Sequence, residues 1–266
     1  MSANKTYRII DSHAHMGPVW NFYLPYNDEQ GMLDNMDRLG VDTVVFSSNL
    51  AVTADVERGN RYTLEVCLRH PGRYLGMYAV NPNYPEVAAK EMDEYFTHKE
   101  IVGIKIHPEL SGDYPLNGKN CAPMFRYASE RKIPILSHTY YGGDKLSVFE
   151  ELAREYPDAP LIIGHGALDL GTGKAIDLCN KYPNLYYDLC SPVNKRYGAL
   201  LLVDRELDPD KALYGTDVPW NDPAVSLGSV LFSGVAPEKL RKWFSGNFLR
   251  LYARAATALD GESAQR

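Results

Sequence analysis

Short apolar runs and longer amphipathic stretches alternate along this chain from one end to the other. The apolar runs are rich in β-branched residues, and several are apolar at consecutive positions rather than at every second one. That pattern predicts strands of a parallel sheet that is covered on both faces. Eight strands are expected, over Tyr7–His13, Val41–Ser47, Tyr74–Val80, Ile101–His107, Ile133–His138, Leu161–His165, Leu185–Leu189 and Ala212–Thr216.

The stretches between these strands have the periodicity of amphipathic helices. Gly40 and the pair Pro71-Gly72 directly follow two of them, as is typical at helix ends. The predicted helices cover Asp28–Leu39, Asp55–His70, Pro85–Phe96, Ala122–Arg131, Lys145–Tyr156, Lys174–Tyr182, Tyr197–Val203, Pro237–Phe244 and Asn247–Ala256.

Regular alternation of strand and helix predicts the α/β class, and eight repeats predict closure as a (β/α)₈ TIM barrel. An open, doubly wound sheet is the alternative. The length of 266 residues is near the ~250 typical of one such barrel, and no linker or low-complexity segment divides the chain. We therefore expect a single domain over residues 1–266, with extra helices at its C-terminal end.

The composition is that of an ordinary globular protein, with 45% hydrophobic and 23% charged residues. The net charge of -6 gives no electrostatic reason to expect binding to nucleic acid or to an anionic membrane. No apolar run is long enough to cross a bilayer, the first residues carry no apolar signal region, and the four cysteines lack CxxC spacing. We therefore expect a cytoplasmic protein with reduced thiols that acts on a small molecule.

Polar residues collect where the predicted strands end. Five of the seven histidines lie there, together with one aspartate. All strands of a barrel open at their carboxyl ends on one face, where active sites lie, so these side chains are expected to converge. They are His13 and His15 at the first strand, His107, His138 and His165 at the fourth, fifth and sixth, and Asp217 after the eighth.

The pair His13 and His15 has a spacing that suits metal binding. Residues two apart on a strand project to the same side, about 6.6 Å from one another, and two imidazoles there can lean onto one ion. His138 and His165 can approach the ion from the barrel wall, and Asp217 adds a carboxylate. Such ligands suit Zn²⁺, with Mn²⁺, Fe²⁺ and Co²⁺ as alternatives. Each residue alone is open to a packing explanation, but the set predicts a metal site.

The chain carries, in this order, the motifs IIDSHAH, GIKIHP, PILSHT, LIIGHG, LYYDLC, YGTDVPW and SGNFLRLY. This order resembles the amidohydrolase superfamily, and within it the amidohydrolase-2 branch, which contains aminocarboxymuconate-semialdehyde decarboxylase and related hydrolases and lyases. The resemblance extends from Ile9 to about Tyr252. It implies a metal-dependent enzyme, and a homodimer is one arrangement that the branch suggests.

Carried over by residue, the resemblance implies that His13, His15, His138 and Asp217 hold one divalent metal. His165 falls where decarboxylase relatives have a catalytic histidine and where hydrolytic relatives often have a further ligand. The resemblance therefore implies catalytic as well as metal-binding roles for His165 and Asp217.

Three further residues are expected to face the substrate. Some superfamily members carboxylate a lysine at the end of the fourth strand to bridge two metals. Lys105 lies two residues before the predicted strand end, so we expect a mononuclear site in which Lys105 and His107 contact substrate. Tyr140, in the loop after His138, is expected to line the pocket with its aromatic ring.

The same ligands serve two reactions. In a hydrolase, the metal lowers the pKa of its water from ~15.7 to near 7, Asp217 takes the proton, and His165 stabilises the oxyanion. In a decarboxylase, the metal anchors a carboxylate while His165 or Asp217 delivers a proton to an unsaturated carbon. Hydrolysis is placed slightly first and decarboxylation second. A barrel that uses its histidines without metal, and an inactive metabolite-binding barrel, are further alternatives.

Overall fold

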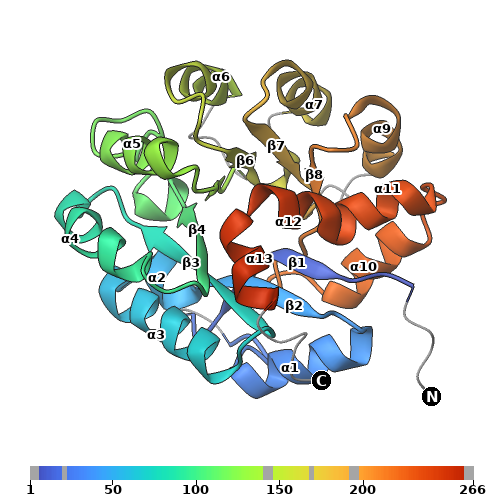
Figure 1. Ribbon diagram of the computed structural model, residues 1–266, viewed down its shortest axis with the longest axis horizontal. Helices are drawn as coiled ribbons and strands as arrows, with labels where there is room; N and C mark the ends of the chain where they lie inside the picture. The colour runs from blue at the N-terminus through green and yellow to red at the C-terminus, as the bar shows by residue number, and fades with distance from the viewer. Residues whose placement is uncertain (1–5, 20–22, 140–145, 168–170, 192–197, 261–266) are drawn as a thin grey trace.

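The computed structural model describes residues 6–19, 23–139, 146–167, 171–191 and 198–260 (Figure 1). Eight strands form one sheet in the order of the sequence, and each strand is parallel to the next. The strands are β1 (Ile10–Met16), β2 (Thr43–Ser48), β3 (Tyr74–Val80), β4 (Ile101–Ile106), β5 (Ile135–Ser137), β6 (Leu161–Ile163), β7 (Leu185–Asp188) and β8 (Ala212–Leu213).

The sheet closes between its first and last strands. β8 has only two residues, but the chain that follows it continues along β1. Ser12 N donates to Tyr214 O at 2.9 Å, Asp217 N to His13 O at 2.7 Å, and His15 N to Val218 O at 2.7 Å. The predicted (β/α)₈ barrel is therefore confirmed, and the open doubly wound sheet is excluded.

Helices surround the barrel as an outer layer, and the last two of them lie across its centre (Figure 1). They are α1 (Glu29–Leu39), α2 (Asn49–Thr53), α3 (Val56–Arg69), α4 (Pro85–Tyr95), α5 (Ala122–Arg131), α6 (Leu146–Glu155), α7 (Thr172–Lys181), α9 (Ala199–Glu206), α10 (Pro223–Leu231), α11 (Pro237–Arg241), α12 (Asn247–Leu251) and α13 (Ala253–Asp260). Short 3₁₀ turns, η1 (Glu109–Ser111) and η2 (Gly164–Ala167), follow β4 and β6, and a π-helical turn, η3 (Lys242–Gly246), joins α11 to α12.

The first strand begins three residues later than its sequence pattern predicts and runs to Met16. His13 and His15 therefore lie within β1 rather than at its end. The polar segment from Asp11 to His15 forms a strand because its side chains are buried and hydrogen-bonded inside the barrel mouth, which overrides its low apolar content.

Two helices of the structure were not predicted, and one predicted helix is divided. Helices α2 and α10 were not expected: α2 has five residues, and α10 is mostly apolar and so lacks a clear polar face. The predicted helix Asn247–Ala256 is divided at Tyr252, where φ of -97° and ψ of 72° interrupt the helical geometry between α12 and α13.

The C-terminal helices close the amino end of the barrel. In Figure 1 they cross the centre of the ring of strands. Phe248 of α12 and Tyr252, whose rings stack with centroids 4.3 Å apart, pack in one cluster with Ile10 and Val102 near the starts of β1 and β4. A larger apolar cluster lies between the strands and the surrounding helices. Burying the amino end leaves the carboxyl ends of the strands as the open mouth of the barrel.

Candidate metal centre

Three predicted ligands meet at the barrel mouth. The Nε2 atoms of His13 and His15, both on β1, lie 3.7 and 3.5 Å from Oδ1 of Asp217. Ligand atoms that each stand about 2.0–2.2 Å from one tetrahedral ion are separated by about 3.4 Å, so these spacings fit joint coordination of a divalent cation. His13 and His15 are buried and Asp217 is 13% exposed, which leaves access to the ion from the Asp217 side.

The other ring nitrogens of the two histidines are held by the protein. Nδ1 of His13 lies 2.7 Å from Oδ2 of Asp188, and Nδ1 of His15 lies 3.3 Å from the carbonyl oxygen of Ser47. A carboxylate and a carbonyl oxygen both accept, so each Nδ1 carries the proton and each Nε2 keeps its lone pair. Such outer partners are typical of metal-ligating histidines, because they fix the tautomer and the ring orientation.

Asp217 is positioned by the segment that closes the barrel. Its φ of 63° is in the left-handed region, which is unusual for a residue with a side chain. Its backbone N–H donates to the carbonyl of His13 at 2.7 Å, and Nδ2 of Asn221 lies 3.4 Å from its Oδ2. A cis peptide follows between Val218 and Pro219. Strained backbone at a hydrogen-bonded carboxylate is common at functional sites.

Lys105 of β4 reaches the same point. Its Nζ lies 2.7 Å from Nε2 of His13, and its side chain is buried. Burial lowers the pKa of Lys105 to about 8, while the charges of Asp217 and Asp188 act in the opposite direction. The protein thus already places a cationic group against the atoms that fit a metal ion. A metal ion would therefore compete with the Lys105 ammonium for the lone pair on Nε2 of His13.

A second group contains His107, Glu109 and His138. Nε2 of His138 lies 3.3 Å from Oε2 of Glu109, and the rings of His107 and His138 stack with centroids 3.7 Å apart and planes 17° apart. Lone pairs of imidazole lie in the ring plane, so two nearly parallel rings cannot both aim at one ion between them. Leu110 N also donates to Nδ1 of His107 at 3.2 Å. This group is better described as a hydrogen-bonded cluster than as a second metal site.

His165 links the two groups. Its Nε2 lies 3.0 Å from Nδ1 of His138, and its Nδ1 lies 3.2 Å from both Sγ of Cys190 and Oγ of Ser191. Its φ of 56° is left-handed, and its backbone N–H donates to Oδ2 of Asp188 at 2.9 Å. His165 is therefore fixed by contacts to its backbone and to both ring nitrogens.

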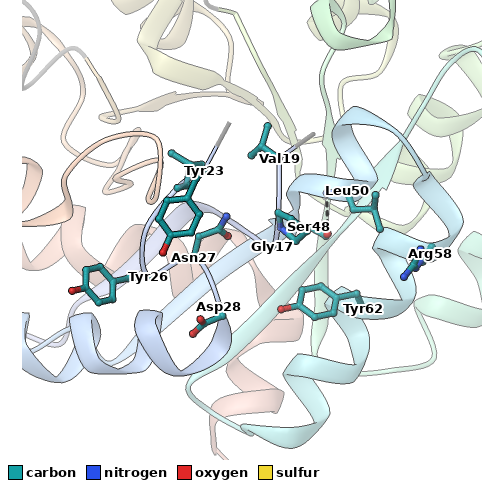
Figure 2. A pocket seen from close by; sticks show the side chains of 12 residues that line it. Gly17, Val19, Tyr23, Tyr26, Asn27, Asp28, Ser48, Leu50, Arg58 and Tyr62 are labelled. Carbon is teal, nitrogen blue, oxygen red and sulfur yellow. Dashed lines mark hydrogen bonds between the residues drawn. The ribbon is translucent and has the colours of Figure 1, made fainter. Parts of the chain in front are cut away.

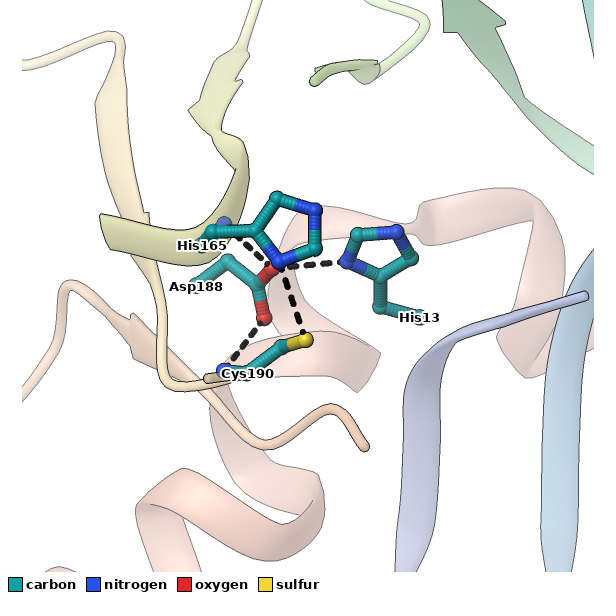
Figure 3. Close-up of side chains that lie close together, drawn as sticks. All are labelled: His13, His165, Asp188 and Cys190. Carbon is teal, nitrogen blue, oxygen red and sulfur yellow. Dashed lines mark hydrogen bonds and ion pairs between the residues drawn. The ribbon is translucent and has the colours of Figure 1, made fainter. Parts of the chain in front are cut away.

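Figure 3 shows His13, His165, Asp188 and Cys190 around one another. Their donor atoms are close enough to suggest a buried metal site. However, the 2.7 Å between Nδ1 of His13 and Asp188 is a hydrogen-bond distance and is too short for two ligands of one tetrahedral ion. Burial and the charge of Asp188 also raise the pKa of the Cys190 thiol well above its usual value, which keeps it protonated. This cluster is held by hydrogen bonds, and through Asp188 it fixes His13 of the candidate metal centre.

The histidines of the mouth are neutral. Burial is the main cause that lowers the pKa of His138 to about 4, and it lowers the pKa values of His13, His15, His107 and His165 as well. Nearby Lys105 contributes in each case. Neutral imidazoles are the form that binds metal, so the site is ready for a cation at neutral pH.

The structure places the predicted site residues as follows. It brings His13, His15 and Asp217 together, with His165 beside His13 at a ring-centroid distance of 5.0 Å and His138 beside His165 at 4.6 Å. Metal ligation by His138 and His165 stays a prediction. Tyr140 lies outside the described residues.

Sequence reasoning missed the partners behind the ligands. Asp188, Ser47 and Glu109 were not singled out, although each carried a signal. Asp188 is the last residue of β7, Ser47 lies at the carboxyl end of β2, and Glu109 follows His107 by two residues. Residues at these strand ends face the same mouth as the ligands.

Several solved structures share this fold. Dihydroxybenzoic acid decarboxylase from Polaromonas sp. JS666, with bound manganese and the inhibitor 2-nitroresorcinol, has a TM-score of 0.76 at 16% identity over 95% of this chain and 99% of that one. 5-Carboxyvanillate decarboxylase from Sphingomonas paucimobilis has a TM-score of 0.72 at 16% identity over 92% and 99%. 4-Oxalomesaconate hydratase from Rhodopseudomonas palustris has a TM-score of 0.68 at 20% identity over 96% and 99%.

No curated protein matches the sequence. Within the described ranges, no helix has the length and apolar character needed to span a membrane. The family model described as amidohydrolase, of the amidohydrolase-2 type, matches residues 10–254, a range that contains every candidate ligand. This confirms the resemblance that the motif order carried. The chain belongs to the amidohydrolase family of metal-dependent enzymes.

Proposed function

We propose that this protein is a metal-dependent decarboxylase that releases CO₂ from a small carboxylic acid. The triangle of His13, His15 and Asp217 supports the dependence on a metal, because its spacings fit one divalent ion at the barrel mouth. The sequence placed hydrolysis slightly ahead. The solved structures of similar fold include decarboxylases of hydroxylated benzoic acids, and they support decarboxylation instead.

A divalent ion would be held by His13, His15 and Asp217, with His138 and His165 as the further predicted ligands. When bound, it would supply a positive charge that orients a substrate carboxylate and polarises a neighbouring oxygen. Zn²⁺ and Mn²⁺ are both candidates: the nitrogen-rich ligands suit Zn²⁺, and a decarboxylase of similar fold contains manganese.

The residues of the chain supply the remaining requirements. Loss of CO₂ replaces a carbon–carbon bond by a carbon–hydrogen bond, so one proton must reach the carbon that carried the carboxylate. We assign this proton to Asp217 or His165, both of which lie close to His13. His13, His15 and Lys105 are buried, so a substrate carboxylate leaves water when it binds, and this favours its conversion to neutral CO₂.

The deciding experiment compares products by mass. Protein loaded in turn with Zn²⁺ and Mn²⁺ is incubated with hydroxylated benzoic acids, unsaturated carboxylic acids, lactones and amides. Loss of the mass of CO₂ from an acid supports the proposal. Gain of the mass of water from a lactone or amide, without CO₂ release, assigns a hydrolase, and gain of water by an unsaturated acid assigns a hydratase.

Asp217→Asn is the matched control for this experiment. The variant keeps the size of the side chain but removes its charge and its proton transfer, so we expect an intact fold and a turnover reduced by orders of magnitude. Activity near that of the wild type would remove Asp217 from the mechanism. If the metal-loaded protein converts none of these compounds, the result would favour the alternative of an inactive metabolite-binding barrel.

Small-molecule substrates, a homodimer and a cytoplasmic location complete the proposal. The dimer follows from the family resemblance alone, and sedimentation of the purified protein tests it.

A further inference from the structure

A buried side-chain amide connects two segments at the rim of the barrel mouth. Asn49 is the first residue of α2, directly after β2, and its side chain is fully buried. Nδ2 of Asn49 donates to the carbonyl oxygen of Gly17 at 2.8 Å. Oδ1 of Asn49 accepts from Nε1 of Trp220 at 3.1 Å. The two partners are far apart in the sequence, so the amide joins parts of the chain that no local structure holds together.

The two segments that Asn49 joins carry candidate metal ligands. Gly17 directly follows β1 and lies two residues beyond His15. Trp220 lies three residues beyond Asp217, and its backbone N–H donates to the carbonyl oxygen of Asp217 at 2.8 Å. The contacts of Asn49 are therefore separated from His15 and Asp217 by only a short stretch of backbone on each side.

The amide of Asn49 also spans the end of the first strand. β1 pairs with β2 on one side, and on its other side it lies against the chain after β8. Asn49 starts from the β2 side and reaches Trp220 on the far side, with the carbonyl of Gly17 between them. Figure 2 shows Gly17 beside Ser48 and Leu50, the two sequence neighbours of Asn49. Three adjacent segments of the mouth are thus joined at one side chain.

The turn after β8 depends on contacts of this kind. The left-handed φ of 63° at Asp217 is strained for a residue with a side chain, and such strain persists only where the surroundings hold it. The turn is fixed at its start, where Asp217 N donates to the carbonyl of His13 at 2.7 Å. At its other end the Trp220 side chain is 39% exposed, so packing alone holds it incompletely. The hydrogen bond from this indole to Asn49 supplies the second fixed point.

We propose that Asn49 is a positioning residue of the metal centre, which keeps the carboxylate of Asp217 at the spacing from His15 that joint coordination requires. It acts through the backbone of the two segments, since its amide is engaged with Gly17 and Trp220. A site whose ligands are held in place before the ion arrives binds that ion more tightly. This inference rests on the metal centre of the proposed function, but not on the reaction carried out there.

A matched pair of substitutions tests the proposal. Asn60, a buried residue of α3, donates from Nδ2 to the carbonyl of Ala79 at 2.9 Å and accepts from Ala79 N at 2.8 Å. Ala79 lies on β3, which carries no predicted ligand. Asn49→Leu and Asn60→Leu each replace a buried, hydrogen-bonded amide by an apolar side chain of similar size. We therefore expect similar losses of stability, measured by urea unfolding, but weaker metal binding in Asn49→Leu alone.

Metal binding is measured in two ways that do not need turnover. Competition with a chelator gives the affinity for Zn²⁺, and the visible absorption of bound Co²⁺ reports the coordination geometry. Asn49→Leu should bind Zn²⁺ about tenfold more weakly and change the Co²⁺ spectrum, since loss of outer contacts typically weakens metal sites to this extent. Asn60→Leu should keep the wild-type affinity and spectrum.

Trp220→Phe is a second variant for the case that Asn49→Leu does not fold. It removes the same hydrogen bond at a partly exposed side chain and keeps an aromatic ring, so it should also weaken Zn²⁺ binding. Wild-type affinity in Asn49→Leu or in Trp220→Phe would overturn the proposal, as would an equal loss in Asn60→Leu. A wild type that binds no divalent ion would overturn the metal centre as well. Failure to release CO₂ would reject the reaction and leave the positioning role standing.

Discussion

Nδ1 of His13 and Oδ2 of Asp188 lie 2.7 Å apart, although 175 positions separate these residues in the sequence. β8 and the chain that follows it lie between β1 and β7 in the barrel, so the contact passes over the position of one strand, at Gly215. The same Oδ2 accepts from the backbone of His165 at 2.9 Å, and Oδ1 accepts from Cys190 N at 3.0 Å. The Asp188 carboxylate thus orients a candidate metal ligand, His13, and a candidate catalytic histidine, His165.

Asp188→Asn should weaken metal binding about 10–100-fold, the usual effect of losing an outer partner of a ligating histidine. The amide keeps the shape and one acceptor but no longer supplies the negative charge that holds the proton on Nδ1 of His13. Competition with a chelator measures the affinity. Asp177→Asn, on the exposed side of α7, is the control and should leave it unchanged. Wild-type affinity in Asp188→Asn would contradict the positioning role.

Lys105→Met should bind a divalent metal more tightly, by about tenfold or more. The ammonium 2.7 Å from Nε2 of His13 competes with a cation for that lone pair, and methionine fills a similar volume without charge. Turnover should fall, because the cationic substrate contact is removed. Two results together would instead indicate that Lys105 is a carboxylated ligand. Lys105→Met would bind metal more weakly than the wild type, and the wild type would bind metal more weakly when bicarbonate is withdrawn.

Much of the fold could be predicted because parallel strands that are buried on both faces have continuous apolar runs in the sequence. The strands at Tyr74–Val80 and Ile101–Ile106 match their apolar runs closely. The first strand was placed too early because its polar residues are stabilised by contacts to distant strands. Thr216 N and Oγ1 both donate to Asp11, for example, and no local pattern reveals that partner.

The part of the candidate site that lies at the carboxyl ends of the strands could be predicted from the sequence. His13, His15 and Asp217 follow from the rule that barrel strands open on one face. The separate pairing of His138 with Glu109 could not be foreseen, because it depends on the turn η1 that returns Glu109 toward β5.

The metal-free protein should lose stability as the pH falls from about 6.5 to 4. Burial lowers the pKa of His138 to about 4 in the folded state, whereas an unfolded histidine titrates near 6.5. Between these values the unfolded chain binds more protons, so the free energy of unfolding decreases with falling pH. Above about pH 6.5 the histidine is neutral in both states, and the protein keeps the full stability that the neutral side chain allows. The other buried histidines shift in the same direction. Urea unfolding in the presence of a chelator measures the effect.

Asp11 should partly offset this acid instability. Burial raises the pKa of Asp11 to about 7, so its contribution to stability is present at low pH and is lost as the pH rises toward 7. Asp11→Asn should therefore make the loss of stability between pH 6.5 and 4 steeper than in the wild type. A slope unchanged in Asp11→Asn would show that this carboxyl is ionised throughout the range.

Gly215→Ala tests how closely the chain after β8 must approach the candidate metal centre. A Cβ at this position would lie 2.8 Å from both Oδ1 of Asp188 and Cβ of His13. Since neither neighbour is a freely mobile side chain, we expect a loss of about 1–3 kcal/mol in the free energy of unfolding and weaker metal binding. Gly228→Ala is the control, because no heavy atom lies within 4 Å of its added Cβ in α10. It should be neutral or stabilising by up to about 1 kcal/mol. Equal stability of the two variants would mean that His13 and Asp188 can separate without cost, which contradicts a preformed metal centre.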